Sequence, residues 1–405
     1  MRRHVTTRLL LGSAATPLLA LGLAVPAVAD GPPAPAAPAV TLLPPLPLTL
    51  GDGAPCTAAS ERTASSGSWV RRTLGYSRAQ ELSRGAGVTV AVVDTGVGGA
   101  VPVLAGRVSA LAGAGTDCVG HGSFLAGVIA AAPAEGSGVV GIAPAADVLA
   151  VSGTDDRGAW EAALVADGIR SAVDAGADVV CTGAALRSGR GVLTAAVRYA
   201  TAHDVLVVAP AAPDLAADTR GDAPPPSGPY WPAAVPEVLA VVDFGPDGSR
   251  PAEAPDAYRP DLAAPGDQVV GVGPRGQGHW IGSGSSIAAA TAAGAAALVR
   301  ARHPTMPAAE VSRQLTEASY PADVPRLDPY AALATVLPEG RTAAAAPAAP
   351  VRMPAAADPQ PGRRALVVAG AGLAVVLLVA GALAVVPLGR ARKWVPQGRR
   401  LPGGR

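Results

Sequence analysis

The sequence predicts an α/β protein with a parallel sheet flanked by helices on both faces. Apolar runs of strand length alternate along the chain with alanine-rich stretches of helical length. The runs occupy residues 88–93, 147–151, 178–181, 205–208 and 238–242, and the helical stretches include residues 160–175 and 192–202. Strands that are apolar throughout are typical of parallel sheets buried on both faces. Their alternation with helices predicts βαβ units.

A further helix is expected at residues 286–300, which are apolar on every side. In a globular protein such a helix lies in the core. It is shorter than the roughly 20 residues that a membrane span requires. Ser286 begins it, so packing of the helix would hold this side chain in a fixed position.

Both ends of the chain have the composition of export and membrane segments. Residues 1–29 carry arginines, then an apolar stretch, then Ala-Val-Ala before Asp30, the pattern of a cleaved signal peptide, with a signal anchor as the alternative. Residues 365–388 lack charge and are long enough to form one transmembrane helix. Basic residues in the tail at 389–405 predict a cytoplasmic C-terminus, with the rest of the chain outside the cell membrane.

Composition divides the remaining chain into one domain and two linkers. Residues 30–56 form a Pro/Ala-rich N-terminal extension, and residues 340–364 form a linker of similar composition. Neither shows an amphipathic period, so both are expected to be extended. Residues 57–339 have the size of one large α/β domain and show no internal repeat.

Charge and motif content argue against several classes of ligand. The 32 basic and 31 acidic residues nearly balance, and aromatic residues make up only 3%, so nucleic-acid binding has no support. The sequence has no phosphate-binding loop, dinucleotide fingerprint or zinc motif, so no cofactor and no metal are expected. Structural calcium at Asp155 and Asp156, or at Asp214 and Asp218, is conceivable, but solvated turns are the simpler interpretation.

Three short motifs place an aspartate, a histidine and a serine in that chain order. Asp94 ends the first apolar run, His121 opens a small-residue helix, and Ser286 begins the helix at 286–300. A serine needs a base to become a nucleophile, and the imidazole needs a carboxylate to hold its tautomer and stabilise its cation. Each motif alone has an ordinary structural explanation. Together they predict a catalytic triad.

These motifs make the chain resemble the subtilases, the subtilisin-like serine proteases. Within them it is most similar to the mycosins, the membrane-anchored proteases of actinobacterial type VII secretion. Further matching segments extend the resemblance from about Arg84 to Leu333; they are residues 137–144, 230–234, 261–266 and 327–333. The resemblance implies a subtilisin-like peptidase domain at 57–339, a protein or peptide substrate and a secretion complex as partner. A general exported subtilase with a C-terminal anchor is the alternative.

One departure from the family concerns the oxyanion hole. Subtilases carry an Ala-Gly-Asn segment after a central strand, and its asparagine donates a hydrogen bond to the tetrahedral intermediate. We assign that asparagine position to Pro213, whose side chain donates nothing. Asp214 could donate only if it carried a proton, so the backbone N–H of Ser286 is the expected remaining donor. Loss of one donor typically lowers turnover roughly 100- to 1000-fold.

Two functions follow from an intact triad beside an altered oxyanion hole. The first is a membrane-anchored extracytoplasmic serine endopeptidase of reduced activity, with Ser286 as nucleophile, His121 as base and Asp94 as the residue that orients it. The second is a weak or inactive pseudoprotease that serves as a scaffold of the secretion complex. The first is preferred because all three reacting groups are retained.

The chain contains three cysteines, Cys56, Cys118 and Cys181. An exported protein can form a disulfide, which leaves one cysteine over. Cys56 and Cys118 are the preferred pair, since Cys118 precedes His121 by three residues and a bridge would fasten the extension beside the site. This arrangement resembles that of the mycosins. Cys181, at the end of an apolar run, is expected to be a buried thiol.

Overall fold

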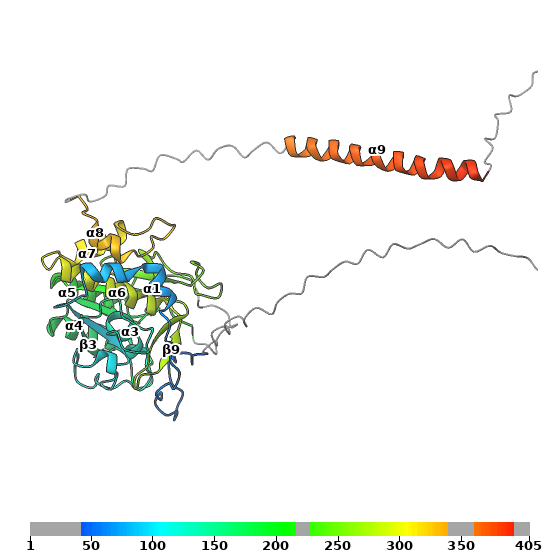
Figure 1. The fold of residues 1–405 in the computed structure, drawn as a ribbon. Coiled ribbons are helices and arrows are strands. Elements are labelled where there is room, and N and C mark those ends of the chain that lie inside the picture. The colour runs from blue at the N-terminus through cyan, green and yellow to red at the C-terminus, as the bar shows by residue number, and fades with distance from the viewer. Residues whose placement is uncertain (1–41, 216–224, 226, 339–359, 393–405) are drawn as a thin grey trace, which may run out of the picture. The chain divides into compact units, whose positions relative to one another are not determined.

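The structure is a computed structural model that describes residues 42–215, 225, 227–338 and 360–392 (Figure 1). The chain separates into two units, Met1–Leu337 and Pro338–Arg405. The predicted signal peptide, most of the predicted linker and nearly all of the tail lie outside the described residues.

The first unit contains a parallel sheet of seven strands, in the order β2-β3-β1-β4-β5-β6-β7. All five predicted strands belong to it. The strands are β1 (Thr89–Asp94), β2 (Val108–Ala110), β3 (Asp147–Ser152), β4 (Val179–Thr182), β5 (Leu206–Pro210), β6 (Leu239–Phe244) and β7 (Leu262–Pro265). The sequence did not reveal β2 and β7, which lie at the two edges and are short.

Helices cover both faces of this sheet, as predicted. One face carries α3 (His121–Ala130) and α6 (Ser285–Arg302), and the other carries α4 (Ala162–Asp174) and α5 (Arg190–Ala202). Alternate residues of β1 face the two layers, because successive side chains of a strand point to opposite sides. Val90 and Val92 lie in the core with α3 and α6, whereas Ala91 and Val93 lie in the core with α4 and α5.

Helix α6 is the predicted central helix. It is buried from Ser285 to Arg300 and contacts five strands of the sheet, β1 and β4 to β7. Gly294 lets the helix pack closely against Ile142, in the segment between α3 and β3, since a Cβ at Gly294 would lie 2.7 Å from the Cβ of Ile142. The helix therefore holds its first residues in a fixed place relative to the sheet.

The remaining elements of this unit lie around the central layers. Sequence analysis did not identify them because they are short or polar on one side. They are α1 (Trp69–Leu74), α2 (Tyr76–Leu82), the 3-10 helix Pro102–Leu104, the antiparallel pair β8 (Val269–Val272) and β9 (His279–Gly282), α7 (Ala308–Glu317) and α8 (Pro329–Ala334).

The second unit contains one described helix, α9 (Gln360–Ala391). It includes the whole predicted span at 365–388 and extends beyond it at both ends. Its segment Arg363–Ala391 has an apolar window of mean hydropathy 2.7, none of which is buried by protein. By length and composition, this helix can cross a bilayer core of about 30 Å.

Candidate active site

The three residues predicted as a triad come from three elements that meet at the carboxyl end of the central strand β1. Asp94 is the last residue of β1, a central strand, and His121 is the first residue of α3. Ser286 lies in the first turn of α6. Carboxyl ends of parallel strands commonly form the ligand site in α/β proteins. All three residues are buried.

Their side chains form a continuous chain of hydrogen-bond contacts. His121 Nδ1 lies 2.8 Å from Asp94 Oδ1, and His121 Nε2 lies 3.1 Å from Ser286 Oγ. Asp94 Oδ1 also accepts a hydrogen bond of 2.8 Å from the N–H of Thr95, which fixes the carboxylate. Gly183 packs against this group, and a Cβ there would lie 2.4 Å from Asp94 Oδ2. Asp94 and His121 therefore have space to contact each other only because residue 183 lacks a side chain.

A fourth side chain, that of Asp214, also contacts the serine. Asp214 Oδ1 accepts a hydrogen bond of 3.0 Å from the N–H of Ser286, and Oδ2 accepts a short one from Ser286 Oγ. The same Oδ2 lies 3.6 Å from His121 Nε2. The Asp214 side chain is only 7% exposed.

This contact corrects two expectations from the sequence. Asp214 is not a solvated turn residue, and the side chain that reaches Ser286 belongs to Asp214 rather than to Pro213. Pro213 lines the adjacent cleft without reaching the serine by a hydrogen bond. The Ser286 N–H, expected as a free oxyanion donor, already donates to a carboxylate oxygen. Asp218 lies outside the described residues.

The two carboxylates determine the charge of the histidine. Burial by itself lowers the pKa of His121, but Asp94 and Asp214 outweigh burial and raise this pKa to about 10. The imidazole therefore carries a proton at neutral pH in the ligand-free site. A protonated imidazole cannot accept the proton of Ser286, so the base must lose or relocate its proton before attack.

A buried aspartate that sequence analysis missed fixes the start of α3. Asp117 Oδ1 accepts hydrogen bonds from Thr95 Oγ1 and from the N–H of Gly120, at 3.0 and 2.6 Å. Its Oδ2 accepts two from Ser123, at 2.9 Å from N–H and 2.7 Å from the hydroxyl. Asp117 thereby ties the residue after Asp94 to the first turn of the histidine helix.

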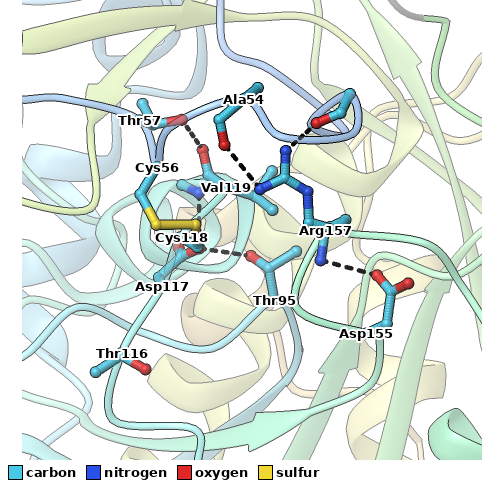
Figure 2. The surroundings of a disulfide bond; sticks show 12 residues. Ala54, Cys56, Thr57, Thr95, Thr116, Asp117, Cys118, Val119, Asp155 and Arg157 are labelled. Carbon is cyan, nitrogen blue, oxygen red and sulfur yellow. Dashed lines mark hydrogen bonds between the residues drawn. A yellow bond between two sulfur atoms is a disulfide. The ribbon is translucent and has the colours of Figure 1, made fainter.

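The predicted disulfide between Cys56 and Cys118 is present and lies next to Asp117 (Figure 2). The N–H and hydroxyl of Thr57 donate to the carbonyls of Cys118 and Val119, at 2.8 and 2.6 Å. Arg157 donates to two carbonyls of the extension. These contacts fasten the extension beside the histidine helix. Cys181 is the predicted buried thiol, and burial raises its pKa, so it stays protonated.

A cleft of about 320 Å³ opens onto the triad. His121, Trp160 and Asp214 line it together with Leu48 and Thr49 of the extension. Its size allows a few side chains of an extended peptide to enter. Within the parts of the chain that the structure describes, no group of three or more His, Cys, Asp or Glu residues is arranged to hold a metal ion.

The fold and the buried Asp–His–Ser arrangement define a serine hydrolase with a subtilisin-like architecture. A model of the Subtilase family matches residues 85–344. The chain belongs to the subtilase family of serine endopeptidases.

The known relatives to which the chain is similar include the mycosins. Mycosin-4 of Mycobacterium tuberculosis is 32% identical over 353 residues, which cover 73% of this chain and 76% of the relative. The crystal structure of MycP1 from the ESX-1 type VII secretion system superimposes with a TM-score of 0.61 at 26% identity, covering 74% of this chain and 96% of that one. A chain in the periplasmic assembly of the ESX-5 inner membrane complex gives a TM-score of 0.61 at 25% identity, covering 77% and 94%.

Proposed function

We propose that the chain hydrolyses internal peptide bonds with Ser286 as nucleophile, His121 as general base and acid, and Asp94 as the residue that orients His121. The observation that carries this proposal is the continuous contact from Asp94 through His121 to Ser286. Ser286 Oγ attacks the substrate carbonyl while its proton passes to His121 Nε2. Asp94 accepts the Nδ1–H and stabilises the imidazolium.

The second half of the reaction reverses the proton transfer. The tetrahedral intermediate collapses as His121 gives its proton to the leaving amine, and an acyl group remains on Ser286. Water then attacks this ester with His121 again acting as base, which releases the acid and restores the hydroxyl. Asp94 keeps the Nδ1–H hydrogen bond throughout, so the imidazole stays correctly oriented in both halves.

Endopeptidase activity is tested by incubating the purified full-length chain, in detergent, with an unfolded protein substrate. We expect new peptides whose ends lie inside the substrate sequence, identified by mass spectrometry. Release of single terminal residues only, or of no peptides from a folded preparation, would contradict the proposal.

We further propose that α9 anchors the chain in the cell membrane with the peptidase domain outside, in association with a type VII secretion complex. The length and apolar surface of α9 support an anchor, and basic residues within 389–405 favour a cytoplasmic C-terminus. Similarity to MycP1 of ESX-1 and to a chain of the ESX-5 inner membrane complex supports the partner.

Removal of residues 363–405 is expected to shift the exported protein from the membrane fraction to the soluble fraction. A helix this apolar inserts stably, whereas the remaining domain has no comparable segment among its described residues. Fractionation of cells followed by immunoblotting measures the change. Deletion of residues 393–405 alone is the control and should leave the protein in membranes. Retention of the longer deletion in membranes would contradict the anchor.

One observation favours a scaffold role as a second candidate. The Asp214 carboxylate occupies the Ser286 N–H that an oxyanion would need. A scaffold would maintain secretion when Ser286 is replaced by alanine and would lose it when the whole chain is deleted. A peptidase that acts in secretion would show a defect in both strains.

A further inference from the structure

The arrangement around Ser286 contains one carboxylate more than a triad requires. Asp214 accepts hydrogen bonds from both the N–H and the hydroxyl of Ser286 and lies 3.6 Å from His121 Nε2. An oxyanion that forms on attack by Ser286 needs hydrogen-bond donors near the Ser286 N–H. The carboxylate therefore occupies the region where negative charge develops, and it supplies no donor.

We propose that Asp214 is the oxyanion-site residue of this peptidase, that as a carboxylate it restrains Ser286, and that it becomes an oxyanion donor when it takes a proton. This inference rests on the proposed function, because it assumes that Ser286 is the nucleophile. In this proposal Asp214 causes the low activity expected at neutral pH, and its protonation makes the site active.

The groups that face Asp214 explain where its proton can come from. His121 on α3 is the cation in contact with it, and Asp94 lies behind His121. On the other side of the loop, Pro213 and Leu215 line a cavity of about 210 Å³ together with three acidic residues, Asp243, Glu253 and Asp267. Asp243 is paired with Arg250 and accepts a hydrogen bond from Ser285.

The proton that activates the site is already present in it. At neutral pH His121 carries one proton more than a base should. The Asp214 carboxylate, as the acceptor of both Ser286 hydrogen bonds, has no proton to donate. Transfer of this proton from His121 Nε2 to Asp214 Oδ2 produces a neutral base and a neutral donor without exchange with solvent. His121 can then accept the proton of Ser286, and the Asp214 hydroxyl can donate to the oxyanion.

Replacement of Asp214 by asparagine is the direct test. The amide has nearly the same size, so it fits the space against Gly284, where an added Cβ would lie 2.1 Å from the Asp214 carboxyl carbon. It supplies an N–H donor that needs no proton transfer and carries no charge. We expect kcat of D214N toward a peptide substrate at pH 7.5 to exceed that of the wild type by about 100-fold.

The pH profile provides a second readout that a merely structural role would not change. In the wild type the working pair must retain its shared proton, so kcat/KM should fall as the pH rises through about 10, the pKa of His121. In D214N the donor does not titrate, and loss of the Asp214 charge lowers the pKa of His121. Activity of D214N should therefore show no fall up to pH 10.5, and it should fall on the acid side as His121 takes up a proton and can no longer act as a base.

The experiment compares full-length wild type, D214N, D214A and S286A in detergent, with circular dichroism to verify folding. D214A removes the restraint without adding a donor and should fall between wild type and D214N. D323N, which alters an exposed aspartate between α7 and α8, is the matched control and should equal the wild type.

The outcomes separate the inference from the proposed function. An active D214N beside a weak or inactive wild type supports both. D214N no faster than an active wild type, or with the same alkaline limb, overturns the inference and leaves the peptidase assignment intact. Activity that persists in S286A overturns the assignment of the nucleophile, and folded but inactive wild type and D214N overturn both.

Discussion

Replacing Ser286 by alanine is expected to lower kcat for peptide hydrolysis roughly 1000- to 10,000-fold, because the loss of about a million-fold typical of an intact site is reduced by the missing oxyanion donor. The hydroxyl that attacks the carbonyl is lost, and His121 and Asp94 have no other nucleophile within reach in the described site. The fold should survive, since the change removes one atom from the start of a helix in which alanine is favourable. Steady-state kinetics with a fluorogenic peptide, compared with thermal unfolding of both proteins, measure the two effects separately.

Ser285 provides the matched control for this substitution. It is the adjacent serine in the same helical turn, and its hydroxyl donates to Asp243 at 2.7 Å instead of to the histidine. Loss of one such hydrogen bond typically costs about 1 kcal/mol, so Ser285→Ala should lower activity by roughly tenfold at most. Equal losses in the two variants would show that Ser286 acts through structure and not through its hydroxyl.

Loss of the Cys56–Cys118 disulfide is expected to lower the free energy of unfolding by about 4 kcal/mol. The bridge joins residues 62 positions apart, and closing so long a loop removes much conformational entropy from the unfolded chain. For a domain of this size the loss corresponds to a fall in Tm of roughly 10 °C. Thermal unfolding of the C56S/C118S variant beside the wild type measures it.

Reduction of the wild type supplies the internal control. Dithiothreitol should lower its Tm by a similar amount and should leave the Tm of C56S/C118S unchanged, because the remaining Cys181 is buried and unpaired. A change in Tm of less than about 2 °C in the double variant would show that the hydrogen bonds of Thr57 and Arg157 hold the extension without the bridge.

The core of the fold could be predicted because its strands are continuous apolar runs between helices. Strand β1 is an example, as its residues Val90 to Val93 are fully buried by two different helical layers. Strand β2 could not be found, because its three residues lie at the sheet edge and none of them is buried. Strand β7 is a four-residue segment, Leu-Ala-Ala-Pro, whose pairing with β6 depends on tertiary contact.

The triad residues could be found since each stands in a recognisable local context, and the structure brings them together. Counting residues from the end of strand β5 did not identify Asp214 as a residue of the site. Had the family segment Ala-Gly-Asn been matched residue by residue to Ala212, Pro213 and Asp214, the acid would have fallen at the asparagine position. Its contact with Ser286 depends on the turn after β5, which local sequence does not define.

Asp117 was missed for a different reason. An aspartate in a loop ahead of a helix is usually a turn or cap residue, and nothing in the local sequence shows that it is buried. Its hydrogen bond to Thr95 crosses from the loop before α3 to the end of β1, 22 residues away. Only the packing of those two segments shows that one carboxylate positions both Asp94 and His121.

The most direct test of the account is covalent labelling with a fluorophosphonate, which reacts with serines activated by a neighbouring base. The full-length protein, folded in detergent, should be labelled on Ser286, more rapidly in D214N than in the wild type, and S286A and H121A should remain unlabelled. Peptide mass spectrometry locates the adduct. Folded wild type and D214N that both remain unlabelled, or carry the label at another serine, would contradict the assignment of Asp94, His121 and Ser286 as a working triad.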